Sequence, residues 1–199
     1  MNLMDAICTR RTYYALSKEA PITTQKITDL VAMALKHTPS AFNMQSARCV
    51  VLFKKDHDKL WDIIGTVLKK IVSTKEFSNT KNKIDAFKEA FGTVLFFEDE
   101  NVITEFRRKF PLYEDRFETW AEHGNAMLQS NVWMLLEEAG LGASLQHYNP
   151  IIDEEIRAIW NWPRNWRLIA QMPFGTPVSE PEEKTFVPMK ERLRTEGES

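Results

Sequence analysis

Two polar stretches hold the side chains of this 199-residue chain that best suit a planar, anionic ligand. The first stretch, residues 10–14, contains Arg10, Arg11 and Thr12. Two guanidinium groups and a hydroxyl can hold a phosphate or a carbonyl edge through charge-assisted hydrogen bonds. Arginines that follow a short helix also interact favourably with the helix dipole. The stretch alone therefore leaves an anion clamp and a helix-end charge pair as alternatives.

The second stretch, residues 39–45, carries Ser40, Asn43 and Gln45 in a polar loop. The loop lies between an expected helix and an expected buried strand, and loops held by rigid elements often carry binding groups. A plain polar turn would explain the same residues. The loop is therefore a candidate only in combination with other segments.

Two later segments add further candidates. Gln146 and His147 follow directly on an expected strand, and the carboxyl ends of strands are favoured ligand positions in α/β sheets. A satisfied surface loop is the alternative for this segment. Lys184 lies in a tail rich in glutamate, where a solvated run of charges is the alternative.

Motifs for other chemistries are incomplete. Gly140-Leu141-Gly142 lacks the third glycine of a dinucleotide-binding turn and follows a helix pattern, which favours a helix cap. The four histidines show no metal-binding spacing, so we expect no metal site. Cys8 and Cys49 form no C-x-x-C pair, and both are expected to be core residues. No side chain is nominated as a catalytic acid, base or nucleophile.

The bulk composition indicates one soluble globular domain spanning residues 1–199. Hydrophobic residues make up 43% of the chain and charged residues 27%, and the net charge is −2. A nucleic-acid partner is not expected, because the chain has no basic excess. A membrane partner is not expected either, because no apolar run approaches about 20 residues. Two unpaired cysteines and the lack of a secretory signal favour the cytoplasm.

Hydrophobic periodicity predicts an α+β domain of four short strands and about six helices. The helices are expected over residues 2–9, 24–36, 57–71, 84–91, 118–139 and 153–160. The strands are expected over residues 49–53, 93–97, 143–146 and 167–172. Residues 73–83 are expected to be a mobile polar connection, and residues 101–117 short helical pieces. The tail at 178–199 has one small apolar cluster and cannot build its own core, so we expect it to pack on something else.

The order of these motifs resembles the nitroreductase superfamily of flavin enzymes. It is also similar to a compact subgroup of that superfamily, the stress- or copper-induced nitroreductases of bacteria and yeasts. The matching pieces come in the family's order and span nearly the whole chain: Arg10-Arg11-Thr12, Pro39 to Gln45, Gly140-Leu141-Gly142 with the following strand, Gln146-His147-Tyr148, Met172 to Pro177, and Lys184.

The resemblance implies a three-layer α/β/α fold with a central, mostly antiparallel sheet. It also implies a homodimer that exchanges the C-terminal segments at 178–199 and binds one FMN at each of two interface sites. The residues that it places at the flavin are Arg10, Arg11 and Thr12 on the phosphate, the ribityl chain or the pyrimidine edge; Ser40, Asn43 and Gln45 from the other subunit; Leu145, Gln146 and His147 along the ring; and Lys184 on the phosphate.

The chain departs from the family pattern at Tyr14. Many members carry a lysine or arginine there, near the ring nitrogen that becomes negative on reduction. Tyr14 is kept among the expected cofactor-binding residues, and Arg48 or a backbone donor is a candidate for the missing charge. A second basic residue is also often found two positions after the tail lysine, where this chain has Phe186.

The activity that the resemblance implies is ping-pong reduction of a small aromatic electron acceptor, such as a nitroaromatic or a quinone, with NAD(P)H as co-substrate. In such an enzyme FMN supplies the redox chemistry, and the protein supplies binding and electrostatics. The alternative is a flavin-binding stress or regulatory protein with little turnover. A cofactor-free α+β interaction protein is a third alternative.

Overall fold

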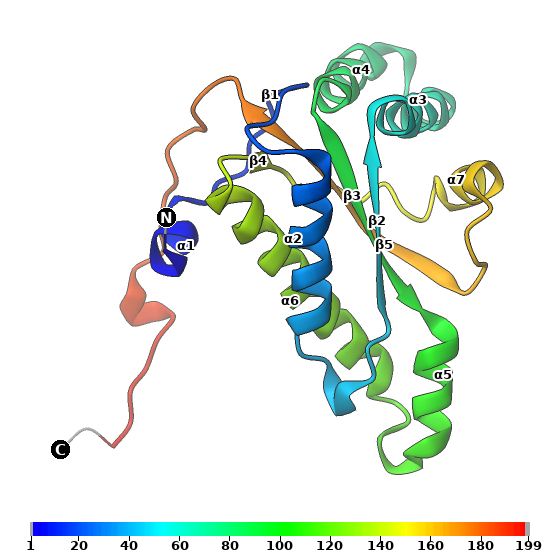
Figure 1. Ribbon diagram of the computed structural model, residues 1–199, viewed down its shortest axis with the longest axis vertical. Helices are drawn as coiled ribbons and strands as arrows, with labels where there is room; N and C mark the ends of the chain where they lie inside the picture. The colour runs from blue at the N-terminus through cyan, green and yellow to red at the C-terminus, as the bar shows by residue number, and fades with distance from the viewer. Residues whose placement is uncertain (1, 198–199) are drawn as a thin grey trace.

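A five-stranded sheet forms the centre of the computed structural model, which describes residues 2–197, and helices cover both faces of the sheet (Figure 1). All strand pairings within this range are antiparallel. The strands lie in the order β1 (Leu16–Ser17), β5 (Trp166–Pro177), β3 (Gly92–Asp99) and β2 (Ala47–Phe53), and β4 (Gly142–Ala143) also pairs with β5. The α+β class and the antiparallel sheet are thus confirmed.

The helices are divided between the two faces of the sheet. One face is covered by α2 (Thr24–His37) and α6 (Phe117–Glu138), with α1 (Leu3–Thr9) beside α6. The other face is covered by α3 (Lys54–Ile71), α4 (Thr74–Lys88) and α7 (Asp153–Trp160). The remaining helical segments are α5 (Glu100–Lys109) and the short turns η1 (Ala41–Asn43), η2 (Pro111–Tyr113) and η3 (Met189–Glu191).

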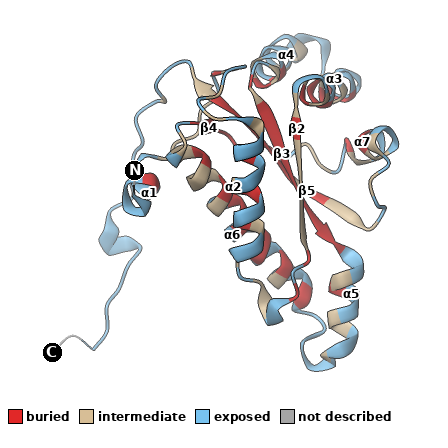
Figure 2. Cartoon of the chain, viewed as in Figure 1, coloured by how far each residue is buried: buried red, intermediate tan, exposed pale blue. Residues whose placement is uncertain are grey.

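Strand β3 joins the two cores because its side chains alternate between the faces. Val94 and Phe96 pack with α2 and α6, whereas Leu95 and Phe97 pack with α3, α4 and α7. All eight residues of β3 are buried, as Figure 2 shows for the central strand. The apolar run that predicted a buried strand is therefore explained by burial on both faces.

The prediction of a mobile connection at 73–83 is wrong, because α4 runs from Thr74 to Lys88. Its apolar residues Phe77, Ile84 and Phe87 lie at helical spacing. They pack onto the second core, which lies between the sheet and helices α3, α4 and α7. Polar side chains fill the positions between them. The apolar stripe of α4 is therefore hard to recognise in the sequence, although it is enough to dock the helix.

Other boundaries also differ from the predictions. Residues 101–117 do hold short helical pieces, which are the ten-residue helix α5 and the turn η2. Strand β5 continues to Pro177, five residues past its predicted end. The predicted strand at 143–146 is reduced to β4 and an isolated bridge between Gln146 and Gln171. Strand β1 was not predicted, and Cys8 is exposed rather than part of the core.

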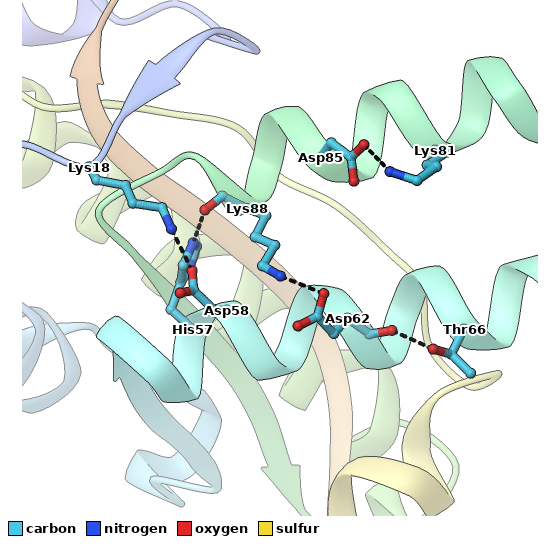
Figure 3. Close-up of polar contacts among 8 residues, drawn as sticks. All are labelled: Lys18, His57, Asp58, Asp62, Thr66, Lys81, Asp85 and Lys88. Atoms are coloured by element: carbon cyan, nitrogen blue, oxygen red, sulfur yellow. Dashed lines mark hydrogen bonds and ion pairs between the residues drawn. The ribbon is translucent and has the colours of Figure 1, made fainter.

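A buried histidine joins α3 to β3 and α4, and Figure 3 draws its contact with Lys88 of α4. His57 Nε2 lies 3.2 Å from the carbonyl oxygen of Lys88, which can only accept, so Nε2 carries the proton. Trp61 Nε1 donates to Thr93 Oγ1 at 3.0 Å, and the Thr93 hydroxyl donates to His57 Nδ1 at 2.9 Å. The neutral imidazole is thus fully satisfied, and burial lowers the pKa of His57 to about 4.

The C-terminal segment extends away from the sheet, and most of its described residues are exposed (Figure 2). Its apolar side chains Phe186, Val187 and Met189 are 72%, 52% and 60% exposed. Exchange of this segment with a second subunit stays a prediction, and residues 198–199 of the predicted extension lie outside the described residues. No helix within residues 2–197 has both the length and the apolar character to cross a bilayer.

Candidate functional site

The N-terminal arginine segment lies directly beside β4. Thr12 and Ala143 form a parallel bridge, and the backbone amide of Tyr13 donates to the carbonyl oxygen of Ala143 at 3.0 Å. The approach is close because residue 142 is glycine: a Cβ atom there would lie 2.8 Å from the Tyr13 ring. Gly142 therefore has a packing role in addition to its place after the cap at Gly140, whose φ is +80°.

A cavity of about 550 Å³ lies between residues 10–15 and the start of the C-terminal segment, residues 179–184. The structure brings Arg10, Arg11, Thr12, Tyr14 and Lys184 together around this cavity. The tail is held there by a hydrogen bond from Val178 N to the carbonyl oxygen of Ala15. The predicted phosphate-side residues therefore share one site in a single chain.

The three cations of this cavity have no carboxylate side chain within salt-bridge distance in the described part of the chain. The Arg10 guanidinium lies 4.6 Å from the Trp133 ring centroid, and Lys184 Nζ lies 5.2 Å from that of Phe186. Arg11 Nη2 donates to the carbonyl oxygen of Glu182. Glutamates 180, 182 and 183 also line the cavity, but they are exposed, so water and salt screen their charges.

Tyr14 lines the cavity, and Tyr148 packs nearby against the core formed with α3, α4 and α7. Tyr14 is 54% exposed, and its ring centroid lies 6.1 Å from that of Phe87 in α4. Burial, with a smaller contribution from the nearby Tyr14, raises the pKa of Tyr148 to about 12. The Tyr148 phenol is therefore a neutral hydrogen-bonding group at physiological pH.

The segment expected along the flavin ring is fixed by its backbone. Gln146 exchanges two backbone hydrogen bonds with Gln171, of 2.7 and 2.9 Å, and its side-chain Nε2 donates to Ser144 Oγ at 3.3 Å. Leu145 packs against the first core, whereas His147 is exposed.

Sequence reasoning missed Gln171, which positions this segment. Its Oε1 accepts from Tyr148 N at 2.7 Å, and its Nε2 donates to Asn149 Oδ1 at 3.1 Å. The side chain is fully buried. The signal in the sequence was a single amide within the apolar run of β5.

The second candidate stretch forms η1 and has unusual backbone angles. Phe42, Asn43 and Gln45 all have φ between 51° and 53°, in the left-handed region that non-glycine residues seldom adopt. Ser40 Oγ accepts from Gln45 N at 3.0 Å, and Gln45 Nε2 donates to the carbonyl oxygen of Asn43 at 3.3 Å. Such strain persists only where the surroundings fix the conformation, and it is often found at functional sites.

Arg48 anchors the loop at residues 40–45. Its Nη1 donates to the carbonyl oxygens of Gln45 and Ala47 at 2.8 and 2.9 Å. Its Nη2 pairs with Asp99 Oδ2 at 2.9 Å, and the Asp99 side chain is nearly buried. The role of Arg48 as a replacement for the cation expected at Tyr14 stays a prediction, and both of its terminal nitrogens already have partners within the chain.

A buried polar chain lies behind the loop. Gln129 Nε2 donates to Asn125 Oδ1, and Asn125 Nδ2 donates to Glu98 Oε1, both at 2.7 Å. Burial raises the pKa of Glu98, although hydrogen bonds from Ser46 and Asn125 and the charges of the nearby arginines lower it. Glu98 and Asn125 border a second cavity of about 320 Å³ that also reaches Ser40 and Gln45.

An aromatic cluster flanks the loop on its other side. The half-exposed Phe42 ring lies 4.6 to 5.9 Å from four aromatic rings. Two come from the segment between α5 and α6 and two from the start of α6: Phe110, Tyr113, Phe117 and Trp120. Flat aromatic surfaces of this kind suit stacking of a planar ligand.

The structure does not bring the two candidate stretches together within one chain. Helix α2, about 21 Å long, separates them: η1 follows its C-terminal end, whereas β4, beside the arginine segment, lies near its N-terminal end (Figure 1). Ser40, Asn43 and Gln45 could complete a site with Arg11 only across two chains. That arrangement stays a prediction. Within residues 2–197, no group of three histidine, cysteine or acidic side chains is placed to hold a metal ion.

Comparison with known proteins identifies a family and several proteins that this chain resembles. The model of the nitroreductase family matches residues 7–176. The yeast protein HBN1 (Saccharomyces cerevisiae) is 39% identical over 186 residues, which cover 92% of each chain. The nitroreductase CinD from Lactococcus lactis, solved in complex with nicotinic acid, is 39% identical, with a TM-score of 0.90 and coverage of 98% of this chain and 99% of that one.

CinD has also been solved with chloramphenicol and with 4-nitrophenol. At the level of the fold alone, a structure from Exiguobacterium sibiricum in complex with FMN is 10% identical, with a TM-score of 0.74 and 98% coverage of both chains. Because the family match and the relatives at 39% identity each span most of the chain, this protein belongs to the nitroreductase family.

Proposed function

We propose that the protein is an FMN-dependent oxidoreductase that uses NAD(P)H to reduce nitroaromatic or quinone-like acceptors. The observation that carries this proposal is the cavity where Arg10, Arg11, Thr12 and Lys184 converge beside β4. Membership of the nitroreductase family makes an oxidoreductase the expected class.

The donor set of this cavity fits the phosphate of FMN. A phosphate carries a charge of about −1.5 to −2 near neutral pH, and three cations line the cavity without a carboxylate pair. Arg11 can form a two-pronged contact with phosphate oxygens once it leaves the Glu182 carbonyl. The volume of about 550 Å³ lies within the usual range for cofactor pockets.

The ring side of the site fits a flat heteroaromatic group. Because Thr12 and Ala143 pair in parallel, the chain leading to Tyr14 runs alongside the chain leading to Leu145 and His147. Backbone bonds to Gln171 fix this second strand of the site, so its orientation is set before a ligand binds.

A homodimer would complete the site with Ser40, Asn43 and Gln45 of the second subunit. In support, α1 exposes Leu3, Met4 and Ile7 at 53% or more, and the C-terminal segment exposes its own apolar cluster. Large exposed apolar areas of this kind mark protein interaction sites. The strained loop would then lie at the flavin, with the Phe42 cluster as a stacking wall for the aromatic acceptor.

When bound, FMN would supply hydride transfer from NAD(P)H and on to the acceptor. The residues of this chain would hold the phosphate, orient the ring and exclude water from it. No side chain is required as an acid or base, and alternating occupation of one face by the two substrates would give ping-pong kinetics.

The test begins with the purified protein. We expect yellow protein with flavin absorbance, and acceptor-dependent oxidation of NADH or NADPH with 4-nitrophenol or a quinone. Arg11→Ala with Lys184→Ala should lose FMN while keeping the wild-type far-UV circular dichroism. Lys190→Ala, in the same tail but outside the cavity, is the matched control. Protein that binds no added FMN would refute the proposal, and bound FMN without turnover would support a low-turnover flavin-binding stress or regulatory protein instead.

A further inference from the structure

Lys83 of α4 reaches the N-terminal candidate segment. Its Nζ lies 5.5 Å from the ring centroid of Tyr14 and 5.7 Å from that of Phe87. The two rings themselves lie 6.1 Å apart at an angle of 40°. Two aromatic faces from separate elements therefore hold one ammonium group, an arrangement favoured by the negative faces of the rings.

The charge of Lys83 is not neutralised by an ion pair in the described part of the chain. Its neighbours on α4 differ in this respect: Lys81 pairs with Asp85, and Lys88 pairs with Asp62 (Figure 3). Residues 81 and 83 also point about 200° apart around the helix. Only Lys83 faces Tyr14, and its ammonium is left available to an anionic partner.

Tyr14 links Lys83 to the ring side of the proposed flavin site. It follows the Thr12–Ala143 bridge and lines the same cavity as Arg10 and Lys184. Its phenol also lies close enough to Tyr148 to influence that group, directly after His147. Lys83 therefore lies against a residue that lines the cavity and that is itself close to the segment expected along the flavin ring.

We propose that Lys83 supplies the positive charge at the flavin ring that the N-terminal segment lacks at residue 14. This inference rests on the proposed function. A two-electron reduced flavin carries a negative charge shared by N1 and the C2 carbonyl oxygen, and a nearby ammonium stabilises that charge more than it stabilises the neutral oxidised ring. Tyr14 then acts as the aromatic platform that positions the lysine, so the charge comes from α4 instead of the N-terminus.

The experiment compares Lys83→Met, Lys83→Arg and the control Lys81→Met, each reconstituted with FMN. The dissociation constant of oxidised FMN is measured by fluorescence quenching, and the midpoint potential by equilibration with a reference dye. For Lys83→Met we expect binding of reduced FMN to weaken about tenfold more than binding of oxidised FMN, which makes the two-electron potential about 30 mV more negative. Lys83→Arg should restore the wild-type potential, and Lys81→Met should leave it unchanged.

A potential for Lys83→Met equal to that of Lys81→Met, in protein that still binds FMN, would overturn the role of Lys83 and leave the proposed function standing. Wild-type protein that binds no FMN would instead refute both. Tyr14→Leu separates the platform from the charge: it should shift the potential in the same direction as Lys83→Met, but less.

Discussion

The backbone amide of Tyr13 donates a 3.0 Å hydrogen bond to the carbonyl oxygen of Ala143, and this bond ties the arginine segment to β4. The two backbones come this close only because Gly142 has no side chain, since a Cβ there would lie 2.8 Å from the Tyr13 ring and 2.9 Å from Pro177 Cγ. The geometry of the proposed phosphate site therefore depends on a residue that does not line its cavity.

Gly142→Ala should displace Tyr13, lower the free energy of unfolding by about 1–3 kcal/mol and weaken FMN binding. The control is Gly65→Ala in α3, where the added Cβ would lie 3.6 Å from Ile84, an ordinary contact. That change should stabilise the protein by about 0.5–1 kcal/mol, because alanine favours the helix. Urea unfolding and FMN titration measure both effects. Wild-type affinity and stability in Gly142→Ala would contradict the packing argument.

Sequence patterns predicted the elements that carry a dense apolar signal. The run from Thr93 to Phe97 predicted β3 because both of its faces are buried. The last part of α4 falls within the helix predicted at 84–91, but residues 74–83 were missed because Phe77 is their only apolar side chain. Strand β1 was missed because two residues are too few to show an alternation of apolar and polar side chains.

The candidate residues were predicted more completely than the residues that position them. Arg10, Arg11, Thr12 and Lys184 share a cavity, as their order in the chain suggested. Arg48 and Asp99 are 51 residues apart in the chain, so no local pattern could pair them. Lys83 lay in a segment expected to be mobile, and only the docking of α4 brings it to Tyr14.

Arg48→Leu should destabilise the fold and loosen the loop at 40–45. The change leaves the nearly buried Asp99 carboxylate without its 2.9 Å partner and removes the bond to the Gln45 carbonyl oxygen. We expect a loss of about 2–3 kcal/mol in the free energy of unfolding, together with faster limited proteolysis at the loop. Lys81→Leu removes an exposed pair with Asp85 and should cost less than about 1 kcal/mol. Equal losses in the two variants would count against an anchoring role for Arg48.

His57→Gln should remove a pH-dependent part of the stability. The folded-state pKa of His57 is lowered from 6.5 to about 4, so the fold favours the neutral ring. The contribution of His57 to the free energy of unfolding is fully present above pH 6.5. It falls by about 3 kcal/mol in total as the pH falls from 6.5 towards 4. Glutamine keeps a donor for the Lys88 carbonyl oxygen but does not titrate.

The measurement for His57 is the difference in unfolding free energy between wild type and His57→Gln at several pH values. The wild-type slope alone is not informative, because burial raises the pKa of Asp153 to about 6 and gives a slope of opposite sign in the same range. We expect the advantage of the wild type over the variant to shrink as the pH falls from 6.5 to 4.5. A difference that stays constant would show that His57 is not held neutral by the fold.

Glu98→Gln should show the opposite pH dependence. Burial raises the pKa of Glu98, so the folded state binds its proton more tightly than the unfolded chain does. The stability that Glu98 contributes is therefore present below its ordinary pKa of 4.5 and is lost as the pH rises through the raised value. Glutamine is neutral throughout and can still accept from Asn125 Nδ2 through its Oε1.

We therefore expect Glu98→Gln to gain stability relative to the wild type as the pH rises above 4.5, as measured by urea unfolding. The matched control is Glu105→Gln on the exposed side of α5, where the side chain is in contact with water in both the folded and the unfolded protein. A gain of equal size at every pH would mean that Glu98 is ionised in the folded protein as readily as in the unfolded chain. In that case Asn125, Ser46 and the nearby arginines would outweigh the cost of burying the carboxylate.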